Sequence, residues 1–100
     1  MIRGTTPTHT FLLPFDTASV RSLRITYAQR GEVILQKSEA DCTCEGDTLR
    51  VQLTQEDTLR FAAGDRMQMQ LRVRTANGDV FASRLLGAEV EDCLCEEVLQ

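Results

Sequence analysis

The segment from residue 66 to residue 74 constrains the fold of this chain more than any other, because its side chains alternate strictly between polar and apolar. The apolar positions are Met67, Met69, Leu71 and Val73, and the positions between them are arginine or glutamine. A period of two is typical of a β-strand with one buried and one solvated face. The segment 75–79 then contains Asn-Gly, a pair that tolerates positive φ, and a second apolar run follows over 80–86. The sequence therefore predicts a β-hairpin over 66–86.

Two registers of this hairpin are compatible with its turn. A two-residue turn at Asn77-Gly78 would place Ala82 and Arg84 on the buried face, and the guanidinium would then lack a partner. A three-residue turn, with Gly78 left-handed and a bulge after it, brings another set of side chains to that face: Phe81, Ser83 and Leu85. We favour the three-residue turn because it leaves the arginine in solvent.

The apolar residues after this hairpin change parity. Leu86, Ala88 and Val90 continue the apolar pattern one position out of phase with Phe81 and Leu85. One extra residue in a strand exchanges its two faces. We therefore expect a slip or bulge between Leu85 and Gly87.

Five further segments read as strands, and one reads as a helical turn. The predicted strands alternate in polarity or lie between turn residues, and they cover 8–15, 22–27, 33–37, 41–44 and 48–54. Pro14 lacks an N–H and marks a strand end or an edge strand, and 16–19 is predicted as a turn. Thr54 precedes two acidic residues and predicts the start of one helical turn, 55–61, whose Leu59 and Phe61 close an end of the core.

About seven short strands with one helical turn predict an all-β fold. Our first interpretation is an immunoglobulin-like β-sandwich, formed by residues 1–100 as a single domain. A small β-barrel is the alternative, because periodicity fixes the faces of strands but not closure of the sheet. The tryptophan and the paired cysteines of antibody domains are absent, so only the general architecture is predicted.

Composition disfavours two classes of partner. A net charge of -4 gives no overall attraction to nucleic acid. No segment approaches the roughly 20 apolar residues of a membrane helix. The apolar patch near the N-terminus is short and is broken by Pro14, unlike the core of a signal peptide. We expect a protein that is cytoplasmic when synthesised, with its cysteines as thiols, and that neither nucleic acid nor membrane is its partner.

No residue set predicts catalysis or a cofactor. His9 is the only histidine, and no nucleophile accompanies it in the sequence, so it is expected to be a polar-tipped strand residue. Four acidic residues crowd 39–47, but their spacing departs from that of a calcium loop: Glu39, Asp41, Glu45 and Asp47. Phosphate loops, nucleophile elbows and zinc-protease motifs are missing. We predict a protein without enzymatic activity, cofactor or metal site.

Two C-x-C pairs are the most suggestive feature for metal binding: Cys42 and Cys44, and Cys93 and Cys95. Four thiolates could bind one zinc ion if the two segments were neighbours. However, residues i and i+2 of a strand lie about 6.6 Å apart, whereas two sulfurs on one zinc lie within about 4 Å, so both strands would have to bend sharply. Buried thiols that act as small apolar side chains, or a disulfide, remain open as alternatives.

Several phrases of the sequence resemble a family of small, mostly uncharacterised proteins encoded in prophage and phage structural regions of gut Firmicutes. The resemblance lies in MIRGTTPTHTF at 1–11, LPFD at 13–16, LTQEDTL at 53–59, RVRT at 72–75, Gly78 and Ala82-Ser83, and it covers nearly the whole chain. It implies a virion, tail or baseplate component or an assembly accessory, and it carries no catalytic residues. The resemblance therefore implies the virion as a second location of this protein, besides the cytoplasm in which it is synthesised.

Two classes of function follow. In the first, the domain is a non-enzymatic structural module that binds other phage structural proteins or a second copy through sheet edges or an apolar patch around Val80 and Ala82. In the second, it binds a small ligand or a cell-surface glycan through loops at one end of the sandwich. Five aromatic residues without tryptophan are few for sugar stacking, so the first class is favoured.

Overall fold

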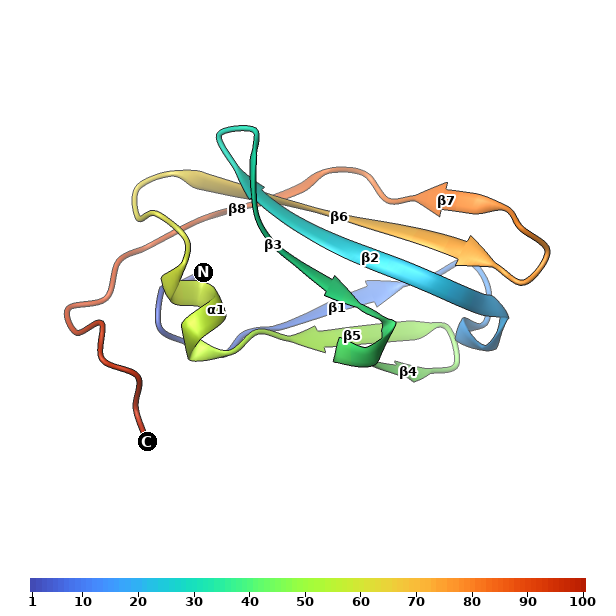
Figure 1. Cartoon of the computed structure of the whole chain (residues 1–100), viewed down its shortest axis with the longest axis horizontal. Helices are drawn as coiled ribbons and strands as arrows, with labels where there is room; N and C mark the ends of the chain where they lie inside the picture. Colours follow the sequence, from blue (N-terminus) through green and yellow to red (C-terminus); the bar gives the residue numbers. More distant parts are fainter.

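The computed structural model describes residues 1–100 and contains eight strands, one α-helix and two short 3-10 helices (Figure 1). The strands are β1 (Thr8–Leu12), β2 (Val20–Gln29), β3 (Glu32–Ser38), β4 (Cys42–Glu45), β5 (Thr48–Gln52), β6 (Arg66–Thr75), β7 (Val80–Ala82) and β8 (Leu86–Glu89). The helices are η1 (Thr17–Ser19), η2 (Glu39–Asp41) and α1 (Gln55–Leu59). The short helices lie at the ends of strands, and the strands carry the architecture.

The strands form two antiparallel sheets that face each other. The smaller sheet has the order β1-β5-β4, and the larger has the order β3-β2-β6-β7, with β8 also paired to β6. No sheet closes on itself, so the fold is a β-sandwich and not the alternative barrel. In the letters used for immunoglobulin domains, these orders read B-E-D and C′-C-F-G, and strand A is missing from the smaller sheet. The predicted immunoglobulin-like sandwich is therefore confirmed.

The N-terminal residues pair with the larger sheet instead. Ile2 forms a parallel bridge with Glu91 just beyond β8. The backbone N–H of Arg3 donates to the carbonyl of Glu91 at 2.9 Å, and the N–H of Glu91 donates to the carbonyl of Met1 at 2.8 Å. The edge of β1 is consequently left without a neighbouring strand.

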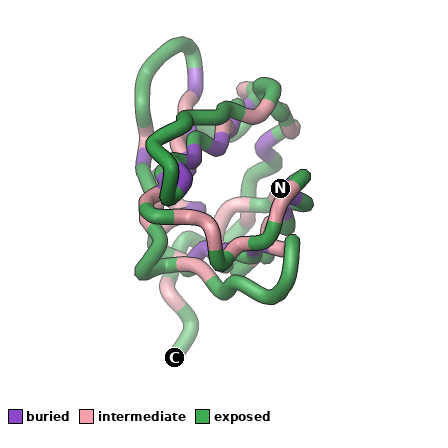
Figure 2. The backbone as a smooth tube through the Cα atoms, turned by 90° about the vertical axis from the view of Figure 1, so that its right-hand side faces the viewer, coloured by how far each residue is buried: buried purple, intermediate pink, exposed green.

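The core lies between the two sheets and consists of the residues that the alternating pattern selected. Figure 2 shows buried positions interspersed with exposed and intermediate ones along the backbone, as the alternating burial of β6 requires. The four apolar residues of β6 are at most 8% exposed. Their buried neighbours in the same sheet are Leu23, Ile25 and Tyr27 of β2, and the opposite sheet contributes Leu49 and Val51 of β5 to the core. Phe61, 1% exposed, follows α1 and stands edge-on to Tyr27, with 6.1 Å between ring centroids. This aromatic pair closes one end of the core.

A helical turn forms where it was predicted, but it ends at Leu59 and not at residue 61, and of the two expected core residues only Phe61 is buried. Its cap explains where it begins. The backbone N–H of Asp57 donates to the Thr54 hydroxyl at 3.0 Å, and the N–H of Thr54 donates to the Asp57 carboxylate at 2.9 Å. Such a reciprocal pair satisfies two of the N–H groups that a helix start leaves unbonded. The Asp57 carboxylate also contacts Lys37 of β3 at 2.8 Å, which joins α1 to the larger sheet.

The strand count differs from prediction because the last strand is split. β7 pairs with residues 72–74 of β6, and β8 pairs with residues 66–69, so the two strands occupy one edge in succession. The register shifts by one residue between them, because Val73 faces Phe81 whereas Met69 faces Leu86. The predicted slip occurs, but it lies at residues 83–85, slightly before the expected position between Leu85 and Gly87. Phe81 and Leu85 were expected on the buried face, but they are 48% and 61% exposed, because Phe81 lies on the last strand of the sheet and Leu85 lies outside both strands.

Candidate protein-interaction surface

The edge formed by β7 is the surface that the sequence indicated at Val80 and Ala82. β7 is the last strand in its sheet, so its outer side has no strand partner. Val80 is 55% exposed, and Phe81 is 48% exposed. Leu85 and Leu86 continue the exposed apolar run at 61% and 44%. We call residues 80–86 the β7 edge.

The turn before the β7 edge fixes its register. The N–H of Thr75 donates to the carbonyl of Asp79 at 2.9 Å, and the N–H of Gly78 donates to the carbonyl of Thr75 at 3.0 Å. Gly78 has φ of +91°, a conformation that favours glycine. The loop is thus Ala76-Asn77-Gly78, and Phe81 lies opposite Val73. The favoured three-residue turn is confirmed, and Arg84 remains exposed.

Phe81 reaches inward over a shallow apolar groove at the open end of the sandwich. The groove has a volume of about 210 Å³ and lies between the end of β1 and strands β6 and β7. Its walls include Phe11, Leu13, Phe15, Leu71, Val73 and Phe81. The rings of Phe15 and Phe81 are 5.4 Å apart, and they contact each other across the two sheets. Because the groove is apolar and open, it suits a side chain of a protein partner.

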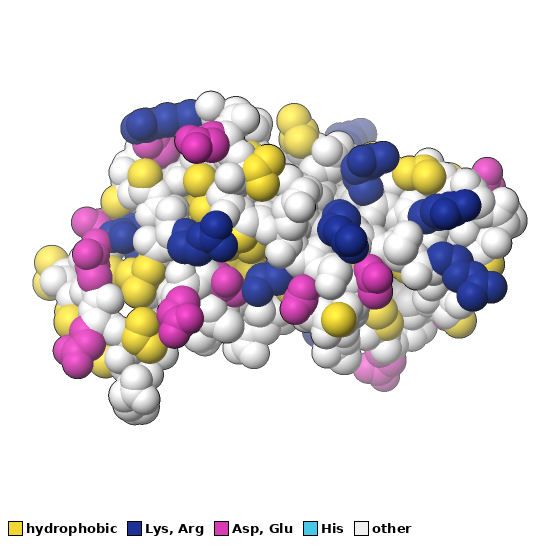
Figure 3. Space-filling model, viewed as in Figure 1, with side chains coloured by type: hydrophobic (Ala, Val, Ile, Leu, Met, Phe, Trp, Pro, Cys, Tyr) yellow, Lys and Arg dark blue, Asp and Glu magenta, His cyan; other side chains and the backbone are white.

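An arginine surface adjoins the β7 edge, and net charge alone gave no sign of it. Its side chains project from the outer faces of β2 and β6: Arg24, Arg72 and Arg74. Arg24 and Arg72 are direct register partners on neighbouring strands. Figure 3 shows basic side chains on both halves of this face, and several of them lie over the half of the molecule where β7 lies. The alternation of arginines in 66–74 could have given the signal, but the partner from β2 required the strand register.

His9 takes a structural place between the two sheets. Its Nδ1 lies 2.7 Å from the Tyr27 hydroxyl, so β1 is bonded to β2 of the other sheet. Burial lowers the pKa of His9 below its ordinary value of 6.5. Burial also raises the pKa of Tyr27 well above 10.0, so the phenol remains protonated. The hydrogen bond between His9 and Tyr27 therefore has a structural role at the core, in line with the prediction that His9 is a polar-tipped strand residue.

The structure does not bring the two C-x-C pairs together. Cys42 and Cys44 lie in β4, whereas Cys93 and Cys95 lie in the C-terminal segment, at the opposite end of the long axis (Figure 1). All four are free thiols. Burial raises the pKa of Cys42 to about 11, and its Sγ donates to the carbonyl of Ser38 at 3.3 Å.

The acidic residues of 39–47 are used separately. Glu39 accepts from the backbone N–H of Leu23 at 3.1 Å, and Asp41 accepts from the N–H of Ser38 at 2.9 Å. No three His, Cys, Asp or Glu side chains converge in a group that could hold a metal ion. Asp41 therefore caps the turn at η2, and Glu39 bonds to the neighbouring strand β2.

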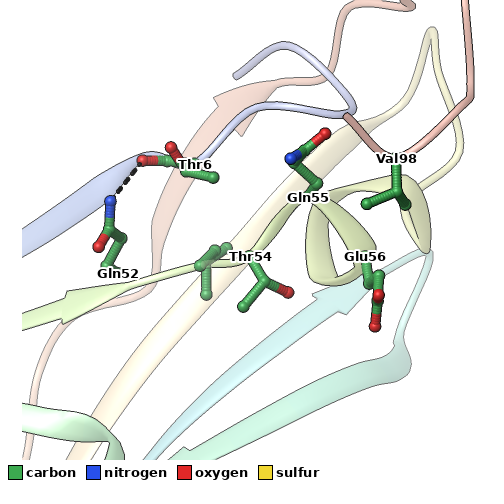
Figure 4. A pocket seen from close by; sticks show the side chains of 7 residues that line it. Thr6, Gln52, Thr54, Gln55, Glu56 and Val98 are labelled. Carbon is green, nitrogen blue, oxygen red and sulfur yellow. Dashed lines mark hydrogen bonds between the residues drawn. The ribbon is translucent and has the colours of Figure 1, made fainter. Parts of the chain in front are cut away.

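A second pocket lies near α1, at the other end of the domain (Figure 4). Its volume is about 320 Å³, and its lining is mainly amide and hydroxyl groups: Thr6, Gln52, Leu53, Thr54, Gln55, Glu56 and Val98. Gln52 donates to the carbonyl of Thr6 at 3.3 Å, and Gln55 donates to the carbonyl of Leu99 at 3.0 Å. Glu56 is the one titratable side chain of the lining. The arrangement offers hydrogen bonds to the chain itself and no acid–base pair.

Comparison with known proteins found no family profile, no curated protein and no solved structure that matches the chain. None of the helices is long and apolar enough to cross a membrane. The surfaces described above are therefore interpreted from their geometry and chemistry.

Proposed function

We propose that this domain is a non-enzymatic structural or assembly protein of a phage or prophage particle and acts through protein–protein contacts. The observation that carries the proposal is the apolar character of the β7 edge. Four large side chains of the β7 edge, Val80, Phe81, Leu85 and Leu86, are each at least 44% exposed. Exposed edges and contiguous apolar residues favour addition of a partner strand or segment. The resemblance to phage-encoded proteins supports the setting.

The other long edge of the same sheet differs in character. β3 carries the charged residues Glu32 and Lys37 and one exposed valine, Val33. Charges on an edge strand oppose pairing with another chain. Strand β7 itself, Val80–Ala82, has no charged side chain, and the single charge of the β7 edge, Arg84, lies after the strand ends. This contrast favours β7 over β3 as the docking edge.

Glycan binding is supported less well by the placement of the aromatic rings. Phe11, Tyr27 and Phe61 are at most 7% exposed and take no part in surface contacts. Phe15 and Phe81 remain, and their rings contact each other at a tilt beside the groove. Sugar binding relies on exposed aromatic faces. The β7 edge therefore suits a protein segment better than a sugar.

Co-expression with the products of neighbouring genes tests the proposal. We expect the tagged chain to purify in a fixed ratio with one of these products, and Val80→Asn to abolish the complex. Val33→Asn is the matched control, because Val33 is 56% exposed on the other edge strand, and it should leave the complex intact. A strict monomer by light scattering together with a clear glycan-array hit would overturn the proposal in favour of the binding module.

A further inference from the structure

The arginine surface has positive charges close together and few carboxylates to balance them. Arg24 and Arg72 lie directly opposite each other in the register of β2 and β6. Like charges in this position destabilise a sheet. Glu39 approaches Arg24 at 3.5 Å, and no carboxylate lies within 4.0 Å of Arg72 or Arg74. An anionic partner would relieve this repulsion.

The arginines also surround a place for such a partner. A depression of about 300 Å³ lies on the outer face of the sheet, and its lining includes Ser22, Arg24, Arg72, Arg74 and Val80. Ser22 and Val80 are the register neighbours of Arg74 on its two sides. Ala82 is the neighbour of Arg72 on the β7 side. The depression therefore joins guanidinium donors to the apolar β7 edge, and it suits a segment that carries both carboxylates and an apolar side chain.

The chain itself contains a segment of this chemistry. Residues 91–97, Glu-Asp-Cys-Leu-Cys-Glu-Glu, form what we call the acidic segment. Glu91 and Glu97 are exposed and have no cation within 4.0 Å. Leu94 between them is fully exposed. The segment thus presents carboxylates on either side of an uncovered leucine.

The acidic segment and the arginine surface of one molecule lie apart along its longest dimension. The molecule measures 47 Å along this axis, and Figure 1 places β7 near one end and the C-terminal segment at the other. Arg3 holds the acidic segment in place through Asp92 and Glu96, each at 2.6 Å. The two complementary surfaces therefore meet only between different molecules.

We propose that the acidic segment of a second copy docks on the arginine surface, with its carboxylates at Arg72 and Arg74 and Leu94 against Val80 and Ala82. The inference rests on the proposed function, because it names a partner for the same end of the domain. The two contact surfaces are different, so the contact is heterologous and continues from copy to copy as an open chain or a ring. An acidic segment of another protein, or a nucleic acid, would contact the same arginines. The test below distinguishes these two occupants from a second copy of the chain.

Nucleic acid is the less favoured occupant. The summed field of a chain with net charge -4 opposes it at a distance. The exposed aliphatic side chains beside the arginines have no role against a phosphate backbone. Both features agree with a protein segment.

Sedimentation equilibrium of paired variants tests the proposal. The first variant, Arg72→Gln with Arg74→Gln, loses the arginine surface and keeps the acidic segment. The second, Glu91→Gln with Glu97→Gln, keeps the arginine surface and loses two carboxylates. We expect wild type to self-associate more weakly as salt is raised, and each variant alone to associate at least about tenfold more weakly than wild type. A mixture of the two variants restores one intact contact and stops at a 1:1 complex.

The control is Arg50→Gln with Arg60→Gln. It changes the net charge as much as Arg72→Gln with Arg74→Gln does, but at exposed positions away from β7, and it should associate as wild type does.

A wild type that remains monomeric at all concentrations overturns the proposal, and so does association that salt strengthens. Association of the Glu91 and Glu97 variant equal to wild type assigns the arginines to another acidic protein. Binding of a fluorescent oligonucleotide that requires Arg72 and Arg74, by a monomeric chain, assigns them to nucleic acid. Co-purification with a neighbouring gene product reports a different complex from self-association, so the proposed function can stand if this inference fails.

Discussion

The hydroxyl of Ser83 accepts a hydrogen bond from the backbone N–H of Leu71 at 2.9 Å, in a place where a strand carbonyl would ordinarily lie. The N–H of Ser83 donates in turn to the carbonyl of Leu71 at 2.8 Å. A side chain thereby completes the ladder at the point where the edge strand is interrupted. This contact keeps β7 aligned on β6 even though the register changes before β8.

Loss of this hydroxyl should loosen the β7 edge. Ser83→Ala leaves the partly buried Leu71 N–H without an acceptor, and we expect a loss of about 1–2 kcal/mol in the free energy of unfolding. Ser83→Thr retains the hydroxyl and should lose less. Urea denaturation measures both values, and an alanine variant as stable as wild type would show that the hydroxyl does not support the edge.

Arg3 should matter more through the backbone than through its ion pairs. Its guanidinium donates to the carbonyls of Phe61 at 2.7 Å and Leu59 at 2.9 Å, and its side chain is 14% exposed. Arg3→Ala leaves both carbonyls without this donor, and we expect a cost of about 2 kcal/mol. Asp92→Asn with Glu96→Gln removes only exposed ion pairs and should cost less in the same denaturation assay. A larger cost for the carboxylate pair would contradict this assignment.

Stability should decrease when His9 becomes protonated. Burial lowers its folded pKa below 6.5, so its contribution to stability is complete above the unfolded pKa of about 6.5 and is lost as pH falls through the lower folded pKa. Denaturation at about pH 8 and about pH 5.5 should show this loss in wild type. The His9→Gln variant should lack the part of this pH-dependent loss of stability that comes from His9. Tyr27→Phe should retain it, because burial is its main cause, and a flat wild-type profile would refute the explanation.

The Cys42 thiol should react slowly. Its pKa of about 11, compared with the ordinary 9.0, lowers the thiolate fraction near pH 8 by about 100-fold. Alkylation of a variant with Cys42 as its single cysteine should therefore be much slower than alkylation of an exposed thiol. A variant that retains only the exposed Cys44 is the comparison. Equal rates in the two variants would mean that β4 does not shield Cys42.

Local patterns predicted much of the fold. The alternation in 66–74 identified the buried face of β6, and the cost of burying Arg84 selected the correct turn. The parity change after Leu85 predicted the slip. These features depend on neighbours in sequence, which is why periodicity could find them. The exposure of Leu85 was missed because a parity argument assumes that the strand continues.

Features that depend on pairing between distant segments were not predictable. Ile2 and Glu91 form a bridge, but neither lies in a segment with alternating polarity. Periodicity could therefore not indicate this pairing, and the first predicted strand began at residue 8. The arginine surface arises because β2 and β6 pair with Arg24 opposite Arg72. Net charge averages over the whole chain and conceals this cluster. Only the sheet register brings these charges together.

Amide hydrogen exchange in the co-expressed complex tests the central claim, docking at the β7 edge, most directly. The outer side of β7 has no strand partner in the isolated domain, and that of β3 also has none. We predict that exchange in residues 80–82 slows by at least about tenfold in the complex, because a docked segment supplies hydrogen-bond partners or excludes water, and that residues 32–38 are unchanged. Slower exchange in residues 32–38, with no change in residues 80–82, would contradict the account.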